Sequence, residues 1–140
     1  MSKWLVCILD SDSYTYTTHD VEDTREAAEK WLVEYIEYEY DSYKWESDNR
    51  LVARCEDEFA VANIFEIQDV DWVVIWHHAY NGVDFEVVAE TDDLMEARTA
   101  MTQKADEALE ICDAELDYEG SNQMVIDTGI EWEVIDIIEL

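Results

Sequence analysis

The chain has 140 residues, of which 49% are hydrophobic, and its 37 acidic and 8 basic residues give a formal net charge of −29. So high an apolar content excludes a disordered acidic tail, and no apolar run reaches the roughly 18 residues that a membrane span requires. The first residues lack the cleavage site of a signal peptide, and three cysteines without a CxxC spacing favour reduced thiols. We therefore expect a cytoplasmic protein with no membrane association.

The first half of the chain predicts two strands, one long helix and a further pair of strands. Residues 3–9 are apolar on both faces, and residues 14–19 alternate threonine with aromatic residues, so these segments favour a hairpin. Asp23 followed by Glu26 is typical of a helix start, and nothing breaks the helical pattern before about Asp48. Residues 51–54 and 59–67 then predict either a hairpin or one long bent strand. The expected apolar stripe of the helix comprises Ala28, Leu32, Tyr35, Ile36 and Tyr43, widened by Trp31, Tyr38 and Trp45.

The second half of the chain predicts the same order of elements. Residues 72–78 and 83–89 predict strands on either side of Asn81-Gly82, which is the strongest short hairpin signal. Asp93 predicts the N-cap of a helix that runs to about Tyr118, and residues 119–122 are expected to end it. Residues 123–140 predict the final strands, around a turn at Thr128-Gly129. The apolar stripe of this helix comprises Leu94, Ala97, Met101, Ala105, Ala108 and Cys112.

The two halves are copies of one unit, because residues 51–67 align with residues 124–140 without a gap. Trp4-Leu5-Val6 likewise matches Trp72-Val73-Val74. The sequence therefore predicts an α+β fold of two tandem β-β-α-β(-β) repeats, residues 1–68 and 69–140, each with one long helix on a face of an antiparallel sheet. Because a domain of about 70 residues is marginal alone, we expect the repeats to share a core in one compact body. The identical pairs in the alignment are Val52/Val125, Glu58/Glu131, Val61/Val134, Ile64/Ile137 and Glu66/Glu139.

The negative charge is divided unevenly between the repeats. Residues 1–68 carry 17 acidic and 6 basic residues (−11), whereas residues 69–140 carry 20 acidic and 2 basic residues (−18). Such an imbalance destabilises the compact state by self-repulsion, and the solubility of a small domain needs only about 2–8 net charges. We therefore expect the excess charge to serve a function.

No pattern in the sequence predicts catalysis or a metal site. His77 and His78 are adjacent on a predicted strand, so their side chains point to opposite faces and cannot share one metal. Asp10-x-Asp12 lacks the glycine and glutamate of a calcium loop, since Thr15 and Val21 occupy those positions. With no nucleophile, phosphate-binding or zinc motif, the sequence predicts a protein that is not an enzyme and has no cofactor.

A row of carboxylates along the second predicted helix is the strongest functional signal. Asp106, Glu110, Asp113 and Asp117 recur every three or four residues, which places them on one ridge with a spacing of about 4.5–6 Å. Lysines between these acids would have replaced each like-charge repulsion by a favourable ion pair, but the ridge contains no lysine. Glu107 and Glu96 lie beside the ridge, and the first helix offers a continuation. The expected partner-binding surface therefore consists of Glu34, Glu37, Asp41, Asp48, Glu96, Asp106, Glu107, Glu110, Asp113 and Asp117.

This composition resembles that of the DNA mimics encoded by phages and mobile elements, which are small, acidic, proline-poor and aromatic-rich antirestriction and anti-CRISPR proteins. The resemblance implies an inhibitor that occupies the basic groove of a nucleic-acid-binding protein, such as a CRISPR effector or a restriction enzyme, and that does not itself bind nucleic acid. Tyr40, on the acidic side of the first predicted helix, could then stack on an arginine of that partner. The resemblance is one of composition over the whole chain and assigns no individual site residue.

Two alternatives remain open at this stage. An acidic surface also suits a salt-adapted interaction domain, because molar salt screens the repulsion. The protein could equally be a regulatory partner of a basic protein such as a histone-like factor. The sequence leaves open the identity of the partner, the stoichiometry and whether the chain forms a homodimer.

Overall fold

The computed structural model describes residues 2–11, 17–79, 83–110, 114–129 and 132–140. The chain divides into two compact units, Met1–Asp69 and Val70–Leu140. We refer to them as unit 1 and unit 2 and describe each by itself.

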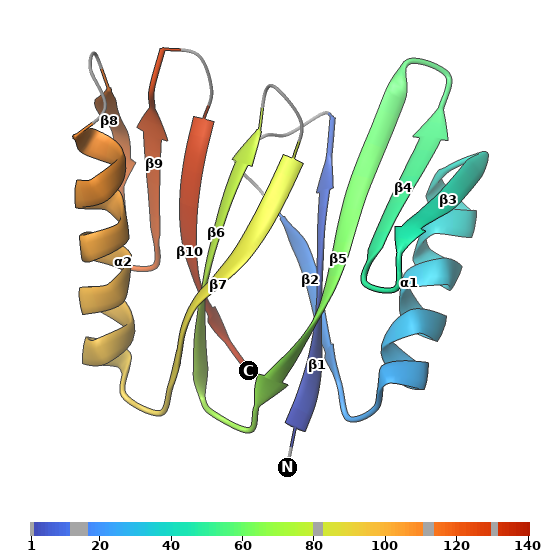
Figure 1. Cartoon of the computed structure of the whole chain (residues 1–140), viewed down its shortest axis with the longest axis horizontal. Coiled ribbons are helices and arrows are strands. Elements are labelled where there is room, and N and C mark those ends of the chain that lie inside the picture. The colour runs from blue at the N-terminus through green and yellow to red at the C-terminus, as the bar shows by residue number, and fades with distance from the viewer. Residues whose placement is uncertain (1, 12–16, 80–82, 111–113, 130–131) are drawn as a thin grey trace. The chain divides into compact units, whose positions relative to one another are not determined.

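Unit 1 consists of an antiparallel five-stranded sheet with one helix against a face (Figure 1). The strand order is β2-β1-β5-β4-β3, so β1 and β5 are central and β2 and β3 are the edges. Its elements in chain order are β1 (Ser2–Asp10), β2 (Thr18–Glu22), α1 (Arg25–Glu39), β3 (Ser42–Ser47), β4 (Arg50–Cys55) and β5 (Glu58–Gln68).

Unit 2 repeats this arrangement, with the strand order β7-β6-β10-β9-β8 and the helix α2 against one face (Figure 1). The prediction of an α+β fold with two tandem repeats and one helix in each is therefore confirmed. The elements are β6 (Trp72–Ala79), β7 (Val83–Thr91), α2 (Leu94–Leu109), β8 (Glu115–Glu119), β9 (Gln123–Asp127) and β10 (Trp132–Glu139).

The strand register shows that the repeats correspond residue by residue. In unit 1 Trp4 lies opposite Glu66, and in unit 2 Trp72 lies opposite Glu139. Residues 51–54 form part of β4 and pair with β5, so the hairpin reading was right and the reading as one bent strand was wrong. This pairing places Leu51 opposite Ala62 in the same way as Met124 lies opposite Ile135.

Both helices begin at a side-chain cap, but only one cap was predicted correctly. Asp93 accepts a hydrogen bond from the N–H of Met95, as expected. In unit 1 the cap is Thr24, which accepts from the N–H of Ala27, so the prediction of Asp23 was wrong by one residue. A threonine hydroxyl can satisfy an unpaired N–H of the first turn as well as a carboxylate can.

Each unit has its own core between its helix and its sheet. In unit 1, Ala28, Leu32 and Ile36 of α1 are fully buried against β1, β4 and β5. In unit 2, the corresponding helix positions are Ala97, Met101 and Ala105. The opposite face of each sheet is apolar as well, with Leu5, Leu9 and Val61 in unit 1 and Val73, Val134 and Ile138 in unit 2. The prediction that the repeats share a core stays a prediction.

Both helices are much shorter than predicted. The backbone of Tyr40 is extended and caps α1, although the prediction carried this helix to about Asp48. The helix α2 ends at Leu109 instead of about Tyr118. In each unit an edge strand, β3 or β8, takes the place of the last part of the predicted helix, so Glu119–Asn122 make a turn between strands and do not end a helix. Tyr43 and Trp45 therefore belong to β3, and Tyr38, assigned to the apolar stripe, is 88% exposed.

The predicted second strand, residues 14–19, is described only from residue 17, and the predicted turn at 81–82 lies outside the described residues, as does Cys112. The described part of this strand is β2, Thr18–Glu22, which pairs antiparallel with β1 and confirms the first hairpin. Between β4 and β5, Glu56 adopts a positive φ of 54° and closes a tight turn. Thr128-Gly129 forms the last predicted turn, where Gly129 has a φ of 89°.

Candidate acidic surface

Three of the predicted carboxylates gather at the C-terminal end of α2. Asp106 and Glu107 occupy its last turns, Glu110 is its C-cap, and all three side chains are exposed. They lie opposite the buried stripe of Ala97 and Met101, as the helical spacing required. We call Asp106, Glu107 and Glu110 the α2 acidic cluster.

The position of this cluster is electrostatically unfavourable. The last turn of a helix carries the negative end of the helix dipole, so acidic residues there are destabilising and basic residues are stabilising. Neither α1 nor α2 has a basic residue in its last turn. Asp106 and Glu110 also repel each other at the i,i+4 spacing.

The continuous helical ridge that the sequence predicted does not form, because α2 ends before it. Asp117 lies on β8 and not on a helix, and Asp113 is outside the described residues. The segment Glu115-Leu-Asp-Tyr-Glu119 alternates acidic and apolar residues with the period of a strand. That alternation predicts a strand, but the three- and four-residue spacing of the acids was taken as evidence for a helix.

The strand β8 adds three acids to unit 2 at a sheet edge. All five of its residues are exposed, including Glu115, Asp117 and Glu119. The register between β8 and β9 shifts between Leu116 and Tyr118, which leaves Asp117 at a bulge. Charges and bulges on an edge strand also prevent pairing with other chains, so part of this acidity has a protective role.

Glu96, assigned beside the ridge, lies in the first turn of α2 and serves the local structure. It accepts a hydrogen bond of 2.7 Å from the hydroxyl of Thr91, and the same hydroxyl accepts from the N–H of Asp93. A carboxylate in the first turn is favoured by the helix dipole. Glu96 is exposed but is separated from Glu110 by about 21 Å of helix.

The acids predicted on the first helix are dispersed over three elements. Glu34 and Glu37 lie on the exposed face of α1, Asp41 follows the helix, and Asp48 lies in the turn between β3 and β4. All four are exposed, but they do not form one helical face. Tyr40, predicted to point toward the acidic side, packs against the core of unit 1.

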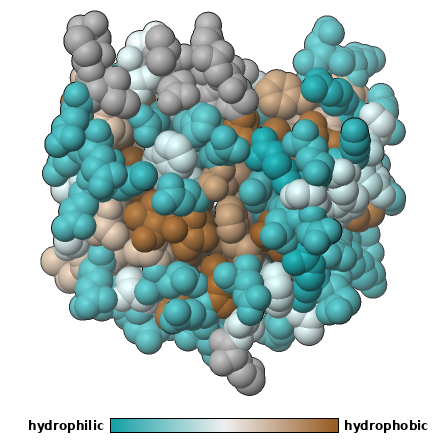
Figure 2. Space-filling model, viewed as in Figure 1, coloured by the Kyte–Doolittle hydropathy of each residue, from teal (hydrophilic) through white to brown (hydrophobic). Residues whose placement is uncertain are grey.

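Lysines neutralise two of the predicted acids. Lys30 lies 4.0 Å from Glu34, and Lys104 lies 3.7 Å from Glu107 and 3.6 Å from Glu86. Lys104 also sits over the indole ring of Trp76, at 4.9 Å from the ring centre. Within the described part of the chain no ion pair joins Asp106, Glu110 or Glu37 to a cation, so these carboxylates remain uncompensated. Figure 2 shows that hydrophilic residues predominate on the surface over both helices.

Asp41 has a local partner that the sequence did not indicate. The thiol of Cys55 donates a hydrogen bond of 3.3 Å to Oδ2 of Asp41. This bond to the carboxylate, helped by slight burial and by the charges of Asp41 and Glu56, raises the pKa of the Cys55 thiol. The thiol is therefore held in its protonated, less reactive form.

A second titratable group with a shifted pKa lies inside the sheet of unit 2. Burial raises the pKa of Asp136 to about 6, although a hydrogen bond of 2.8 Å from the amide of Gln123 opposes the shift. The corresponding pair in unit 1 is Asn63 and Arg50, with Nη1 of Arg50 donating to Oδ1 of Asn63 at 3.3 Å. A shifted carboxyl group can mark a functional site, but Asp136 is paired with Gln123 inside the sheet and stands apart from the exposed acids.

The histidines do not assemble into a site. His77 is fully buried against Phe85, whereas the ring of His78 contacts Trp76 in a tilted arrangement and its Nε2 lies 3.2 Å from Asp84. The two side chains thus take different environments, as adjacent strand positions require. In the described ranges no group of three His, Cys, Asp or Glu residues could hold a metal ion, and no helix there is long and apolar enough to cross a membrane.

Comparison with protein-family models, curated proteins and solved structures finds no significant match.

Proposed function

We propose that this protein is a nucleic-acid mimic that inhibits a basic nucleic-acid-binding protein of a host defence system, such as a CRISPR effector or a restriction enzyme. The inhibitor would occupy the cationic groove of its target in the host cytoplasm, and its exposed carboxylates would take the places of phosphates. Such binding is steered by charge and is sensitive to salt.

The α2 acidic cluster is the observation that supports this proposal best. Each acid near the C-terminal end of a helix costs about 0.3–1 kcal/mol, and a like-charge i,i+4 pair adds a few tenths. For Asp106 and Glu110, which have no ion pair among the described residues, this amounts to about 1–2.5 kcal/mol, a sizeable share of the 5–15 kcal/mol by which domains are stable. Because these positions are exposed, lysine would fit there and would remove the unfavourable interaction with the helix dipole. A role of the carboxylates in binding explains why the chain has acids there instead.

The acids of β8 extend the same negative surface to a second element of unit 2. Glu115 and Glu119 are exposed on this strand, and the bulge at Asp117 turns another carboxylate away from the ladder. With 19 acidic and 2 basic residues in Val70–Leu140, unit 2 is the stronger candidate for the main binding surface. Unit 1 then supplies secondary contacts through Glu34, Glu37 and Asp48.

A competition experiment tests the proposal. Purified protein is added to a panel of CRISPR effectors and restriction enzymes bound to labelled duplex DNA, and displacement is measured from about 50 to 500 mM salt. We expect displacement from at least one target, with an affinity that falls steeply as salt rises. Displacement that is indifferent to salt, or absent across the panel, would overturn it.

A matched pair of variants separates a specific surface from net charge alone. Asp106→Lys with Glu110→Lys changes the charge of the α2 acidic cluster by four units, and Asp57→Lys with Glu58→Lys makes the same change at an exposed turn of unit 1. The first pair should abolish displacement, whereas the control pair should weaken it only slightly. Equal losses would show that only the total charge matters.

A salt-adapted interaction domain is the second candidate. It is favoured by acids that are crowded even away from the proposed surface: on β2, a hydrogen bond and charge repulsion from Asp20 raise the pKa of Glu22. Thermal unfolding distinguishes the two, because a salt-adapted domain should unfold in dilute buffer, whereas an inhibitor must remain folded there.

A further inference from the structure

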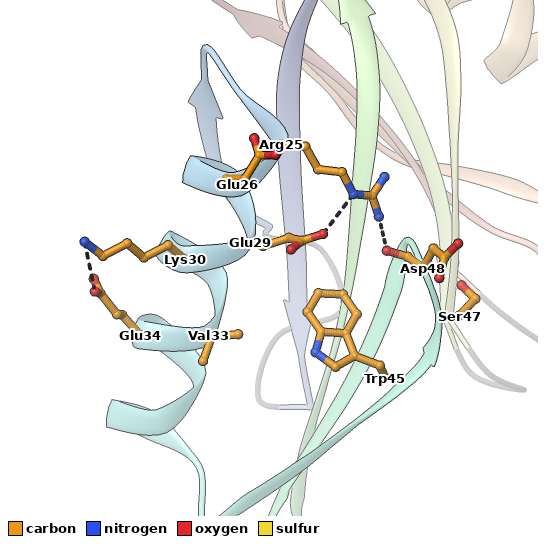
Figure 3. A pocket seen from close by; sticks show the side chains of 9 residues that line it. All are labelled: Arg25, Glu26, Glu29, Lys30, Val33, Glu34, Trp45, Ser47 and Asp48. Atoms are coloured by element: carbon orange, nitrogen blue, oxygen red, sulfur yellow. Dashed lines mark hydrogen bonds and ion pairs between the residues drawn. The ribbon is translucent and has the colours of Figure 1, made fainter.

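Unit 1 contains an open groove of about 920 Å³ between the first turns of α1 and the β3–β4 hairpin (Figure 3). One wall is the helix and the other is the end of β3 with the turn that follows. Its lining residues are Arg25, Glu26, Glu29, Lys30, Val33, Glu34, Trp45, Ser47 and Asp48.

The floor of the groove is aromatic. Trp45 pairs with Leu51 of β4 and therefore lies on the sheet face that the helix covers. Its indole is half-buried, and Figure 3 shows it facing the groove from below Glu29, with Val33 on the helix side. A flat group that enters the groove can therefore contact the indole ring of Trp45 as well as the carboxylates.

The one cation near the floor is already engaged. Nε of Arg25 donates to Glu29 at 2.8 Å, another of its nitrogens donates to the backbone oxygen of Asp48, and its guanidinium also lies 5.4 Å from the ring centre of Trp4. Arg25 therefore ties the helix to the hairpin and closes one end of the groove. These contacts hold the carboxylate of Glu29 close to the hairpin that carries Trp45.

The remaining charge of the groove is negative. Lys30 is 77% exposed and extends from the helix toward Glu34 at 4.0 Å, away from the floor. Four carboxylates line the groove against two cations, and those of Glu26 and Asp48 have no ion pair within the described residues. The groove therefore lacks about two positive charges.

We infer that this groove receives an arginine side chain of the basic partner, with its guanidinium against the indole of Trp45 and its N–H groups directed at Glu29 and Asp48. This inference rests on the proposed function and identifies a specific contact within it. A guanidinium is flat, stacks on aromatic rings and donates to carboxylates in a fixed fork, whereas a lysine ammonium is a compact, strongly hydrated charge. The aromatic floor thus selects arginine over lysine.

Unit 2 has no equivalent groove floor. The position that corresponds to Trp45 is Glu119, since both lie opposite matched residues of the next strand, and the position of Arg25 corresponds to Leu94. Among the described residues, therefore, unit 1 offers such an arginine site and unit 2 does not, and the site would fix the orientation in which the partner binds.

Titration with two blocked peptides, tetra-arginine and tetra-lysine, tests the inference on the full chain. Both carry the same charge, so the ratio of their dissociation constants isolates the stacking contribution. We expect wild-type protein to bind tetra-arginine about two- to fivefold more tightly at 100 mM salt, as a partly exposed cation–π contact predicts. The indole N–H resonance of Trp45 should shift with tetra-arginine and shift much less with tetra-lysine.

Three variants decide the outcome. Trp45→Leu should make the two affinities equal, whereas Trp45→Phe should retain the preference for arginine and guards against loss of folding as an explanation. Trp31→Leu is the control, because Trp31 is also half-buried in unit 1 but stacks on Tyr35 outside the groove. A preference that survives Trp45→Leu, or that Trp31→Leu removes equally, would overturn the inference.

The result separates this inference from the proposed function. Arginine selectivity that depends on Trp45, without displacement of DNA from any target, would support the groove and reject the mimic. Displacement of DNA by both wild type and Trp45→Leu with equal affinity would support the mimic and reject the groove.

Discussion

Unit 1 and unit 2 share one fold but carry different surfaces. Their strands pair in the same order and register, and their helices bury equivalent positions. Over the two units, however, Met1–Asp69 has 18 acidic and 6 basic residues (−12), and Val70–Leu140 has 19 acidic and 2 basic residues (−17). The difference lies almost entirely in the basic residues: unit 2 is more negative because it has two of them where unit 1 has six.

Four of the six cations of unit 1 form ion pairs within that unit. Lys3, Arg25, Lys30 and Arg50 each lie within 4.0 Å of a carboxylate of the same unit. Exposed ion pairs of this kind contribute little stability, typically 0–1 kcal/mol, but they remove negative charge from the surface. The fold therefore tolerates both solutions, and more of the negative charge of unit 2 than of unit 1 is left without a counter-charge.

The helix–sheet core offers the largest expected contrast. Ile36 in unit 1 and Ala105 in unit 2 occupy equivalent positions, and both are fully buried. Ile36→Ala should lower the free energy of unfolding by about 2–5 kcal/mol, because the sheet of unit 1 cannot close the cavity. Urea unfolding followed by far-UV circular dichroism measures this change.

The reverse exchange, Ala105→Ile, should destabilise unit 2 by about 1–3 kcal/mol through overpacking. The control for both core variants is Tyr38→Ala, at an 88% exposed position of α1, which should change stability by less than about 0.5 kcal/mol. If Ile36→Ala were as mild as Tyr38→Ala, the packing of α1 on its sheet would be wrong.

The polar pair within each sheet gives the next largest effect. Asp136→Asn makes unit 2 resemble unit 1, where Asn63 stands at the same place. The pKa of Asp136 is raised to about 6 in the folded state, so the folded protein binds its proton more tightly than the unfolded chain does. Stability is therefore highest below the unfolded pKa, near 4, and is lost as the pH rises through 6.

At pH 7.5 the buried charge of Asp136 should cost about 3 kcal/mol, and at pH 5 about half of that. Asp136→Asn keeps an oxygen for the hydrogen bond from Gln123 and removes the charge, so it should raise the urea midpoint at pH 7.5 more than at pH 5. A stabilisation that does not change with pH would show that Asp136 is not the group that titrates.

The repeat could be predicted from sequence because the central strands keep matching residues, whereas their register was not predicted. Trp4 aligns with Trp72 and Glu66 with Glu139, and in the structure Trp4 lies opposite Glu66 just as Trp72 lies opposite Glu139. Along the helices Thr24 corresponds to Asp93, an offset of 69 residues, whereas the predicted caps Asp23 and Asp93 differ by 70. Matching the acidic residues Asp23 and Asp93 could not show that the first cap is the next residue, Thr24.

The helix ends could not be predicted from local pattern. The residues after Glu39 contain no glycine or proline, and their acids and aromatics fit a helical spacing as well as an alternating one. Pairing with β4 in unit 1 and with β9 in unit 2 favours the strand. In unit 1 the strand places Trp45 opposite Leu51, where it packs against the core. The groove escaped prediction for the same reason: its walls come from Arg25–Glu34 and 45–48, which only the hairpin brings together.

The contrast between the surfaces predicts unequal contributions to partner binding. Neutralising the α2 acidic cluster with Asp106→Asn, Glu107→Gln and Glu110→Gln should weaken displacement of DNA about 3- to 150-fold, at roughly 0.2–1 kcal/mol per charge. The same change in unit 1, with Glu34→Gln, Glu37→Gln and Asp41→Asn, should weaken it less, because Lys30 and Cys55 already engage two of these acids. Larger losses from unit 1 would reverse the assignment of the main surface.

The smallest predicted effect concerns Asp41, whose local role distinguishes it from the acids of unit 2. Its carboxylate accepts from the Cys55 thiol and raises the pKa of that thiol, whereas Ala114 and Thr128 occupy the equivalent positions in unit 2. Asp41→Asn removes the charge that disfavours the thiolate, so iodoacetamide should label Cys55 faster at pH 7.5, as measured by peptide mass spectrometry. Buried Cys7 should stay unlabelled in both proteins and serves as the folding control. An unchanged labelling rate at Cys55 would mean that Asp41 is free to face a partner, and would return it to the binding surface.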